Sequence, residues 1–464
     1  MIVMKFGGTS VGDGERIRRV AEIVAERATG EVLVVVSAME GVTDALIRAA
    51  RAAAGQQGDL LHRLISQLSL RHEQAAREVA PQGETDLLLG KIRALIQEFR
   101  HLCSAIQILG ELTPRGLDAV ASLGERLSVR LLAASIRSLG LPACPIEATE
   151  LIVTDSSHGT ASPLMDLTRE RTRKTLLPLL EKGAIPVVTG FIGATKEGAI
   201  TTLGRGGSDF TAAILGSCLD ADEVWIWTDV DGVMTADPRV VPEAHTLPEL
   251  SYAEAAELSY FGGKVIHPKT ILPAVEKNIP IRIKNTFNPD GPSTLIVARP
   301  RAEAPLIKTI TSIKGLSLIT VEGRGMLGVP GIAAKLFSAV AHQGISVLMI
   351  SQSSSEQNIC FVIREEETKR ALHALKEAFS PELSSRNVDR IWAERGVAIV
   401  AAVGQGIKTV PGIAGKLFGA LGKAGINVIS IAQGSSEYNI SLVVRQEEVD
   451  RAVRAVHQEF FPGG

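Results

Sequence analysis

Aromatic residues, cysteines and excess charge are what this sequence has little of. Phe, Trp and Tyr make up 4% of its 464 residues, and the formal net charge is −2. Surfaces that stack nucleobases need aromatic rings, and surfaces that attract nucleic-acid backbones or anionic membranes need an excess of basic residues. The composition therefore argues against a nucleic-acid partner and gives no reason to expect a membrane one. The apolar fraction of 45% and the charged fraction of 22% are typical of a globular protein.

Cysteine is also rare. The cysteines lack the paired spacing of a zinc site, a redox motif or a disulfide framework; they are Cys103, Cys144, Cys218 and Cys360. No apolar run approaches the roughly 20 residues of a membrane-spanning helix. A strand pattern begins at residue 2, which leaves no room for a signal peptide. We therefore expect a cytoplasmic protein with reduced cysteines and no resident metal site.

What the sequence does have is a regular alternation of short strands and helices. Residues 1 to about 300 contain apolar runs at 32–36, 185–189 and 224–228, which are typical of strands buried on both faces of a sheet. Helical patterns lie between them, so we predict an α/β sandwich with a largely parallel sheet. Residues 56–109 carry apolar residues at helical spacing instead, which predicts a helical excursion. The length predicts two or three domains.

Two glycine-rich loops follow strand patterns and precede helical ones. They are Lys5-Phe6-Gly7-Gly8-Thr9-Ser10 and Gly204-Arg205-Gly206-Gly207-Ser208-Asp209. Backbone N–H groups in such loops, a helix N-terminus and the Lys5 ammonium group all favour an anion. Either loop alone can be an ordinary turn, and neither has Walker spacing. Two such loops that face one crevice can hold a polyphosphate.

Charged side chains in and after these loops suggest more specific roles. Arg205 carries a planar fork that suits a carboxylate. Asp209 can orient Lys5, approach a metal or simply cap a helix. The segment 228–232, Thr-Asp-Val-Asp-Gly, ends a buried strand, where open α/β sheets bind ligands. It lacks the later glutamate of an EF-hand, and a plain Asp-Gly turn is the simpler alternative.

The C-terminal part contains an internal repeat. Residues 329–337 recur at 410–418, 81 positions later, and the same offset carries Gln352 onto Gln433. Each copy reads strand, helix, strand, strand, helix, and the first copy continues into a further strand near 388–392. The second copy lacks this final strand.

The apolar segment 306–310, which precedes the first copy, can supply the missing strand. We therefore predict that the second module is discontinuous and that the first module is inserted into it. The prediction requires 306–310 to pair with the sheet of residues 397–444.

Together these motifs resemble the aspartate kinase family of the amino-acid kinase superfamily. The resembling segments are 5–11, 204–209, 228–232, 237–239 (Asp-Pro-Arg) and 264–268 (Lys-Val-Ile-His-Pro). The repeat resembles tandem ACT domains, and the order of all parts matches over nearly the whole chain. The resemblance implies an αβα amino-acid kinase domain at 1–302, followed by two ferredoxin-like βαββαβ ACT domains. The first ACT domain is expected at 313–394, and the second, discontinuous one at 303–312 plus 395–464.

This resemblance also implies a reaction. The family transfers the γ-phosphoryl group of Mg-ATP to the β-carboxylate of L-aspartate, the first step of lysine, threonine and methionine biosynthesis. Aspartate already carries a carboxylate nucleophile, so no general base is required. The resemblance implies a monofunctional enzyme, without the dehydrogenase domain of some relatives. The alternatives are a kinase for a glutamate-type acid and a catalytically silent amino-acid sensor, which would be expected to have lost Lys5, Arg205 or Asp209.

The family pattern also assigns site residues. The catalytic pair is Lys5 and Asp209. The expected substrate-binding residues are Ser37, Thr43, Glu125, Arg205 and Ser208. The expected nucleotide-binding residues are Lys5, Gly7, Gly8, Ser10, Gly206, Gly207, Thr228, Asp229, Arg239 and Lys264. Glu125 is preferred to Glu111, which has a similar neighbourhood. Met39 stands where the family commonly has Ser or Gly.

Paired ACT domains in this family form an amino-acid site that inhibits the kinase. The residues expected at this site are Gln352, Gln433, Asn358 and Asn439. The pattern Ser-Gln-x-Ser-Ser-Glu resembles that of threonine-sensitive members, so threonine is the favoured effector and lysine the second. Such effector sites bring subunits together, which implies a homodimer or a dimer of dimers.

Overall fold

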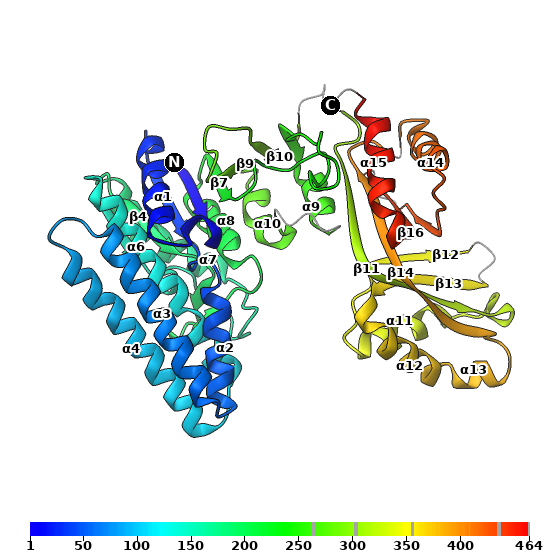
Figure 1. Ribbon diagram of the computed structural model, residues 1–464, viewed down its shortest axis with the longest axis horizontal. Helices are drawn as coiled ribbons and strands as arrows, with labels where there is room; N and C mark the ends of the chain where they lie inside the picture. The colour runs from blue at the N-terminus through cyan, green and yellow to red at the C-terminus, as the bar shows by residue number, and fades with distance from the viewer. Residues whose placement is uncertain (261–265, 301–304, 354–356, 408, 434–437, 463–464) are drawn as a thin grey trace. The chain divides into compact units, whose positions relative to one another are not determined.

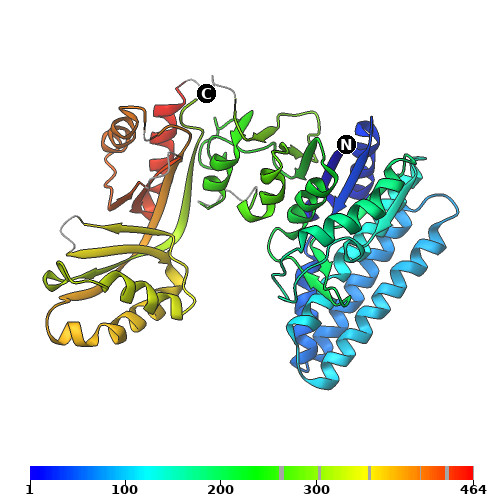
Figure 2. The ribbon, with the colours of Figure 1, turned by 180° about the vertical axis from the view of Figure 1, so that it is seen from behind.

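A computed structural model describes residues 1–260, 266–300, 305–353, 357–407, 409–433 and 438–462. The chain forms two compact units (Figures 1 and 2). The first consists of Met1–Val233, Pro248–Tyr252 and Val265–Arg301, and the second of Met234–Leu247, Ala253–Lys264 and Ala302–Gly464. The predicted domain limits at 302 and 312 stay a prediction.

The first unit is built on an eight-stranded sheet. Its strand order is β3 (Ala143–Ile146), β4 (Ile185–Thr189), β2 (Val32–Val36), β1 (Ile2–Phe6), β7 (Glu223–Thr228), β9 (Ile281–Asn285), β10 (Thr294–Val297) and β8 (Glu249–Ser251). Every neighbouring pair is parallel except β9 and β10. A separate antiparallel pair consists of β5 (Ile192–Ala194) and β6 (Ile200–Thr202). The predicted, mainly parallel sheet is confirmed.

Helices cover both faces of this sheet. The helices of the first unit are α1 (Gly14–Arg27), α2 (Val42–Ala54), α3 (Gly58–Val79), α4 (Thr85–Leu109), α5 (Pro114–Ala121), α6 (Leu123–Ser138), α7 (Met165–Leu180), α8 (Gly207–Leu219) and α10 (Pro268–Glu276). Met4 and Phe6 of β1 share a core with α1, α2, α3, α4 and α6. On the opposite face, Gly216 of α8 lies against Val3. Because side chains alternate along a strand, Lys5 points to the α8 face. The predicted helical excursion is confirmed as α3 and α4.

The second unit contains a six-stranded antiparallel sheet. Its order is β12 (Met349–Gln352), β13 (Asn358–Arg364), β11 (Thr309–Glu322), β14 (Arg390–Val403), β16 (Asn439–Arg445) and β15 (Ser430–Ala432). The accompanying helices are α9 (Tyr252–Tyr260), α11 (Ile332–His342), α12 (Thr368–Ala378), α13 (Ser380–Ser384), α14 (Ile413–Lys423) and α15 (Val449–Phe460). Among the residues that the structure describes, each copy of the repeat has a hydrophobic core of its own.

The two copies share strands β11 and β14. Thr309 pairs with Val403, which confirms the predicted pairing of the segment near 306–310 with the second copy. The sequence suggested that the strand at 306–310 and the first strand of the first copy are separate, but the structure has a single strand, β11. The register shifts near Gly315. Gly315 and Gly396, at equivalent repeat positions, have φ values of 74° and 66°. The strand continues through this irregularity because glycine tolerates the left-handed region.

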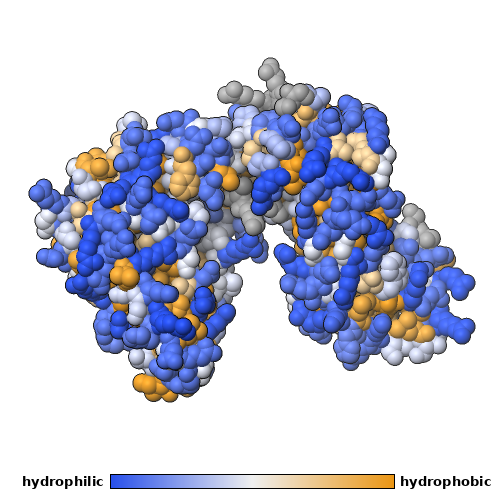
Figure 3. Space-filling model, viewed as in Figure 1, coloured by the Kyte–Doolittle hydropathy of each residue, from blue (hydrophilic) through white to orange (hydrophobic). Residues whose placement is uncertain are grey.

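The surface is largely polar on the face that Figure 3 shows, with apolar residues in small, separate groups. Ile108 and Leu109, at the end of α4, are among the exposed large apolar side chains. Within the described parts of the chain, we find no helix with the length and apolar character needed to cross a bilayer.

Candidate active site

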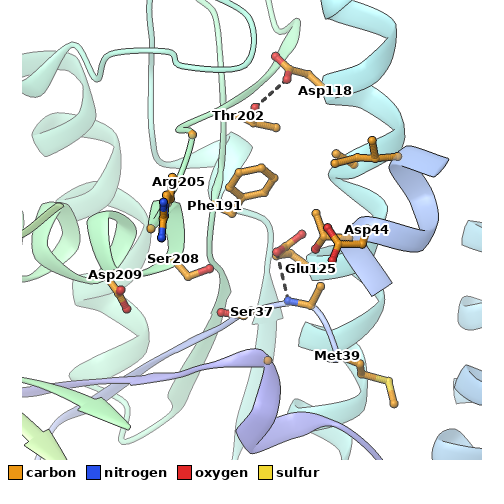
Figure 4. A pocket seen from close by; sticks show the side chains of 18 of the residues that line it. Ser37, Met39, Asp44, Asp118, Glu125, Phe191, Thr202, Arg205, Ser208 and Asp209 are labelled. Carbon is orange, nitrogen blue, oxygen red and sulfur yellow. Dashed lines mark hydrogen bonds between the residues drawn. The ribbon is translucent and has the colours of Figure 1, made fainter. Parts of the chain in front are cut away.

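The candidate site lies where several parallel strands end. Strands β4, β2, β1 and β7 are parallel neighbours, so their carboxyl ends meet at the same edge of the sheet. A pocket of about 580 Å³ is lined by the loops after β1, β2 and β4 and by the start of α8 (Figure 4). The predicted site residues that line it are Lys5, Gly8, Ser37, Thr43, Glu125, Arg205, Gly206, Gly207, Ser208 and Asp209.

Lys5 and Asp209 form an ion pair in this pocket. Lys5 comes from β1 and Asp209 from the first turn of α8, and the distance from Nζ to Oδ1 is 2.6 Å. Their side chains are only 11% and 16% exposed, which reduces screening by water. No described group donates a well-aligned hydrogen bond to Oδ1, so the contact is chiefly electrostatic. The N-cap of α8 is Gly206, not Asp209, which excludes the capping role considered for this aspartate.

Glycines allow the second loop to approach its neighbours. Gly206 has a φ of 72°, a conformation that favours glycine. A Cβ atom on Gly207 would lie 2.7 Å from Cδ2 of Phe191. The turn therefore needs glycine at both positions. It places the N-terminus of α8 beside Lys5, an arrangement that favours an anion.

Glu125 is a buried acid with one unused oxygen. It lies in α6 and is 3% exposed, and its Oε1 accepts a hydrogen bond from the Ala38 N–H at 3.1 Å (Figure 4). Gly124 permits this approach, because a Cβ atom there would lie 2.7 Å from the Ala38 Cβ. Oε2 has no partner among the described residues. Burial raises the pKa of Glu125 to about 8.

Arg205 and Glu125 lie on opposite sides of the pocket in Figure 4. Arg205 is exposed, and no described residue forms an ion pair or hydrogen bond with its guanidinium group. The hydroxyl-bearing residues Ser37, Thr43 and Ser208 line the same cavity. The pocket thus offers a free cation, a carboxyl group with a free oxygen and several hydroxyls, which together suit an amino acid.

Other residues of the predicted set lie outside the pocket lining. Gly7 directly follows β1, and its N–H donates to the carbonyl oxygen of Trp227 at 3.2 Å. Ser10 is buried, with its Oγ 2.7 Å from Thr286 Oγ1. Thr228 ends β7, next to β1, and its hydroxyl donates to Asp229 at 3.1 Å.

Arg239 and Lys264 are the other residues expected to bind the nucleotide. Arg239 belongs to the second unit, where its 88% exposed side chain pairs with Asp237 at 2.6 Å. Lys264 lies outside the described residues. Among those that are described, no group of three or more His, Cys, Asp or Glu residues is arranged to hold a metal ion.

Several pocket residues were not predicted from the sequence, and Asp118 and Phe191 are two of them. Asp118 of α5 is 2% exposed, and it contacts Thr202 at the end of β6 (Figure 4). Phe191 follows β4 and has a φ of 68°, which is unusual for a non-glycine residue. The position of Phe191 directly after a buried strand was a usable signal, because such positions face the ligand edge. Asp118 gave no comparable signal.

The structure also shows where Met39, which differs from the family pattern, and Glu111, the alternative to Glu125, are located. Met39 is buried in the core shared by α1, α2 and α6, and in Figure 4 its side chain points away from Glu125. Glu111 is exposed and does not line the pocket. The preference for Glu125 over Glu111 thus agrees with the geometry.

The residues expected at the effector site lie at strand ends of the second unit. Gln352 ends β12, Asn358 begins β13, Gln433 follows β15 and Asn439 begins β16. Ser351 Oγ donates to the carbonyl oxygen of Ile431 at 3.1 Å, so the two edge strands approach one another near both glutamines. Asn439 Nδ2 donates a hydrogen bond to Glu257 of α9.

Comparison with known proteins agrees with this arrangement. A model of the amino acid kinase family matches residues 1–285, and an ACT domain model matches 319–379 and 400–460. The crystal structure of E. coli aspartokinase III in complex with aspartate and ADP has a TM-score of 0.81 and 31% identity, covering 99% of this chain and 100% of that one. The chain belongs to the aspartokinases of the amino acid kinase family.

Another structure of the same E. coli enzyme and a bifunctional relative also match nearly all of this chain. A structure of the E. coli enzyme with lysine and aspartate has a TM-score of 0.82 and 31% identity, covering 99% of both chains. Bifunctional aspartokinase/homoserine dehydrogenase 2 of Arabidopsis thaliana, a chloroplastic protein, is 41% identical over 465 residues, which cover 99% of this chain and 50% of that protein. The chain thus spans about half the length of such bifunctional relatives.

Proposed function

We propose that this chain transfers the γ-phosphoryl group of ATP to the β-carboxylate of L-aspartate, giving 4-phospho-L-aspartate and ADP. The proposal rests above all on the pocket, where the Lys5–Asp209 pair lies with a free guanidinium group and a buried carboxyl group. The E. coli relative was crystallised with aspartate and ADP. This activity is the first step of lysine, threonine and methionine biosynthesis.

Phosphoryl transfer depends on placing the reactants and neutralising charge. In the proposed mechanism the Lys5 ammonium group contacts oxygens of the transferred phosphoryl group, while Asp209 fixes its direction. The N–H groups at the start of α8, after Gly206 and Gly207, add partial positive charge. The β-carboxylate of aspartate is itself the nucleophile, so the pocket needs no general base.

The acceptor is held by its amino-acid end. Arg205 can bind the α-carboxylate through two N–H groups, and the free Oε2 of Glu125 can accept a hydrogen bond from the ammonium group. The nearby hydroxyls of Ser37, Thr43 and Ser208 can contact the remaining carboxylate oxygens. Held at both charged groups, aspartate would present its β-carboxylate toward Lys5.

The residues present suit Mg-ATP as the phosphoryl donor. Mg²⁺ commonly binds through phosphates, water and one or two carboxylates. The lack of a larger acidic cluster among the described residues is therefore compatible with it. Asp209 is the carboxylate nearest Lys5, and Mg²⁺, when bound, would neutralise charge on the phosphates. We assign nucleotide binding to the glycine loops and to Thr228, Asp229, Arg239 and Lys264.

The ACT domains would make this kinase sensitive to an end product. Threonine is the favoured effector and lysine the second, since Gln352 and Gln433 offer amides suited to a hydroxylated amino acid. The E. coli relative was crystallised with lysine. We also propose a homodimer or a dimer of dimers, because an effector site between ACT domains commonly joins subunits. The free thiols of all four cysteines support a cytoplasmic location.

The decisive experiment is ATP turnover with a panel of acids. We expect activity with L-aspartate and a loss of about 1,000-fold in kcat for Lys5→Ala, because a charge-stabilising donor is removed. Lys196→Ala, which changes an exposed lysine outside the pocket, is the matched control and should keep full activity. Preference for glutamate would support the alternative kinase, and the absence of turnover with every acid would support a silent sensor.

A further inference from the structure

Asp118 is a buried carboxylate for which the proposed mechanism has no use. It lies in α5, lines the pocket and is 2% exposed. Its Oδ1 accepts a hydrogen bond from Thr202 Oγ1 at 2.7 Å, and its Oδ2 accepts one from Gly159 N at 3.1 Å. The Nδ1 atom of His158 lies 2.8 Å from Oδ2, and an ionised carboxylate can only accept, so this nitrogen is the donor.

Electrostatic attraction of the substrate does not explain an acidic residue at this position. The proposed acceptor is an anion, and a negative group beside it opposes its binding. The pocket already contains more acidic than basic side chains; the acidic residues are Glu40, Asp44, Asp118, Glu125 and Asp209, and the basic ones are Lys5 and Arg205. A buried carboxylate in such a pocket therefore calls for a role other than attraction of the substrate.

Asp118 contacts the chain on two sides of the loop that carries Arg205. Thr202 ends β6, three residues before Arg205. On the other side, the Gly159 carbonyl oxygen packs against Gly204, since a Cβ atom on Gly204 would lie 3.3 Å from it. A single carboxylate thus fixes both the strand that leads into the loop and the backbone against which the loop rests. Figure 4 shows Asp118 joined to Thr202, away from Glu125.

We propose that Asp118 is a positioning residue that holds the Arg205 loop in the geometry needed to capture the acceptor's α-carboxylate. This inference rests on the proposed function. It makes Asp118 a determinant of acceptor affinity that acts through Arg205 without touching the substrate. Loss of its contacts lets the loop shift, and small misplacements of a binding group have large kinetic effects.

The test compares two substitutions of Asp118. Asp118→Ala removes every contact and should raise the KM for aspartate about 10- to 100-fold, with little change in kcat or in the KM for ATP. Asp118→Asn removes the charge but keeps one acceptor oxygen, so it should rescue part of the affinity. A pure charge effect predicts the opposite sign, because both variants would then lower the KM for aspartate.

Two controls separate positioning from other effects. Asp44→Asn removes a negative charge from an exposed residue of the same pocket and should leave the KM for aspartate unchanged or lower it. In an Arg205→Ala background, Asp118→Ala should add little, because residues that act through one another are not additive. Thermal melting and binding of MgADP verify that each variant is folded.

Three results would overturn the proposal. They are an unchanged or lower KM for aspartate in Asp118→Ala, full additivity with Arg205→Ala, and an equal loss of aspartate and ATP affinity, which would indicate general damage. If Asp118→Ala does not fold, the sign of the change in Asp118→Asn decides instead. Failure of the wild-type protein to phosphorylate aspartate is a separate result, which removes the proposed function itself.

Discussion

The two sheets of this molecule organise their functional residues differently. In the first unit, parallel strands end at one edge, so residues far apart in the sequence, such as Lys5 and Phe191, line one pocket. In the second unit, an antiparallel sheet is shared by two copies of a repeat, and the two glutamines expected at the effector site lie at the ends of its outer strands. Under the proposed function, catalysis would depend on the convergence of residues at one sheet edge, and regulation would depend on the duplicated module.

After the loss of Lys5, the largest effect is expected from a change at the buried acid of the same pocket. Glu125→Gln should raise the KM for aspartate about 100-fold, because the buried partner of the ammonium group loses its charge. The KM for ATP should change little. The measurement is steady-state kinetics with each substrate varied in turn.

Glu111→Gln is the matched control for this prediction, since that glutamate is exposed and outside the pocket. It should behave as the wild type. If Glu111→Gln raised the KM for aspartate and Glu125→Gln did not, the acceptor site would have to lie elsewhere and the convergence argument would fail.

The pH dependence of aspartate use also tests the role of Glu125. Burial raises the pKa of Glu125 to about 8, so below that pH the free protein carries a neutral carboxyl group and must lose a proton to bind an ammonium group. We expect kcat/KM for aspartate to fall up to about tenfold for each pH unit below 8. The slope should disappear in Glu125→Gln. A wild-type profile that is flat between pH 6 and 8 would contradict this role.

The raised pKa of Glu125 also predicts how the stability of the folded protein depends on pH. The folded protein retains the Glu125 proton up to about pH 8, whereas an unfolded chain loses it near 4.5. The folded state therefore binds more protons between these values, and its stability should decline as pH rises through them. Glu125→Gln should weaken this decline, which thermal melting of the ligand-free protein between pH 6 and 8.5 would detect.

In the regulatory unit, substitutions should leave the chemistry intact. Gln433→Ala should raise the threonine concentration needed for half inhibition about tenfold, within the usual range of coupling energies. The kcat without effector should stay unchanged. Gln352→Ala tests whether the two copies contribute equally. Inhibition by lysine alone, or unaltered threonine inhibition in Gln433→Ala, would exclude the threonine assignment.

Short motifs in the sequence predicted many of the residues that line the candidate pocket. Lys5 lies near the end of an apolar strand that leads into two glycines, and alternation along that strand directs it toward α8 and Asp209. Glu125 was chosen because the segment around it resembles a family motif, and Gly124 supplies the physical reason for that motif. Such signals are local, so they can be recognised before any tertiary contact is known.

Asp118 could not be found in this way. It lies within an ordinary helical pattern, and its burial arises from His158 and Thr202, which are 40 and 84 positions away in the sequence. The single strand β11 was missed for a related reason. Gly315 looks like a strand end in the sequence, but pairing with β14 on both sides carries the strand through it.

The smallest effects are expected from alanine substitutions at Gly315 and Gly396, which test whether the two copies of the repeat are equivalent. Gly315 and Gly396 occupy equivalent positions, both have positive φ, and a Cβ atom would meet nothing within 4 Å at either one. Alanine should therefore add only backbone strain, about 1–2 kcal/mol at each site. If the copies are equivalent, Gly315→Ala and Gly396→Ala should accelerate hydrogen exchange in β11 and β14 to a similar extent.

Gly419→Ala provides the matched control. Gly419 lies exposed in α14, its Cβ would also meet nothing within 4 Å, and its φ is not positive. Alanine there should stabilise the helix by about 0.5–1 kcal/mol, the opposite sign. Neither class of change should alter kcat, because the proposed active site lies at the other sheet. A clear difference between the two strand glycines would show that the copies, although alike in sequence, carry unequal shares of the stability of the regulatory sheet.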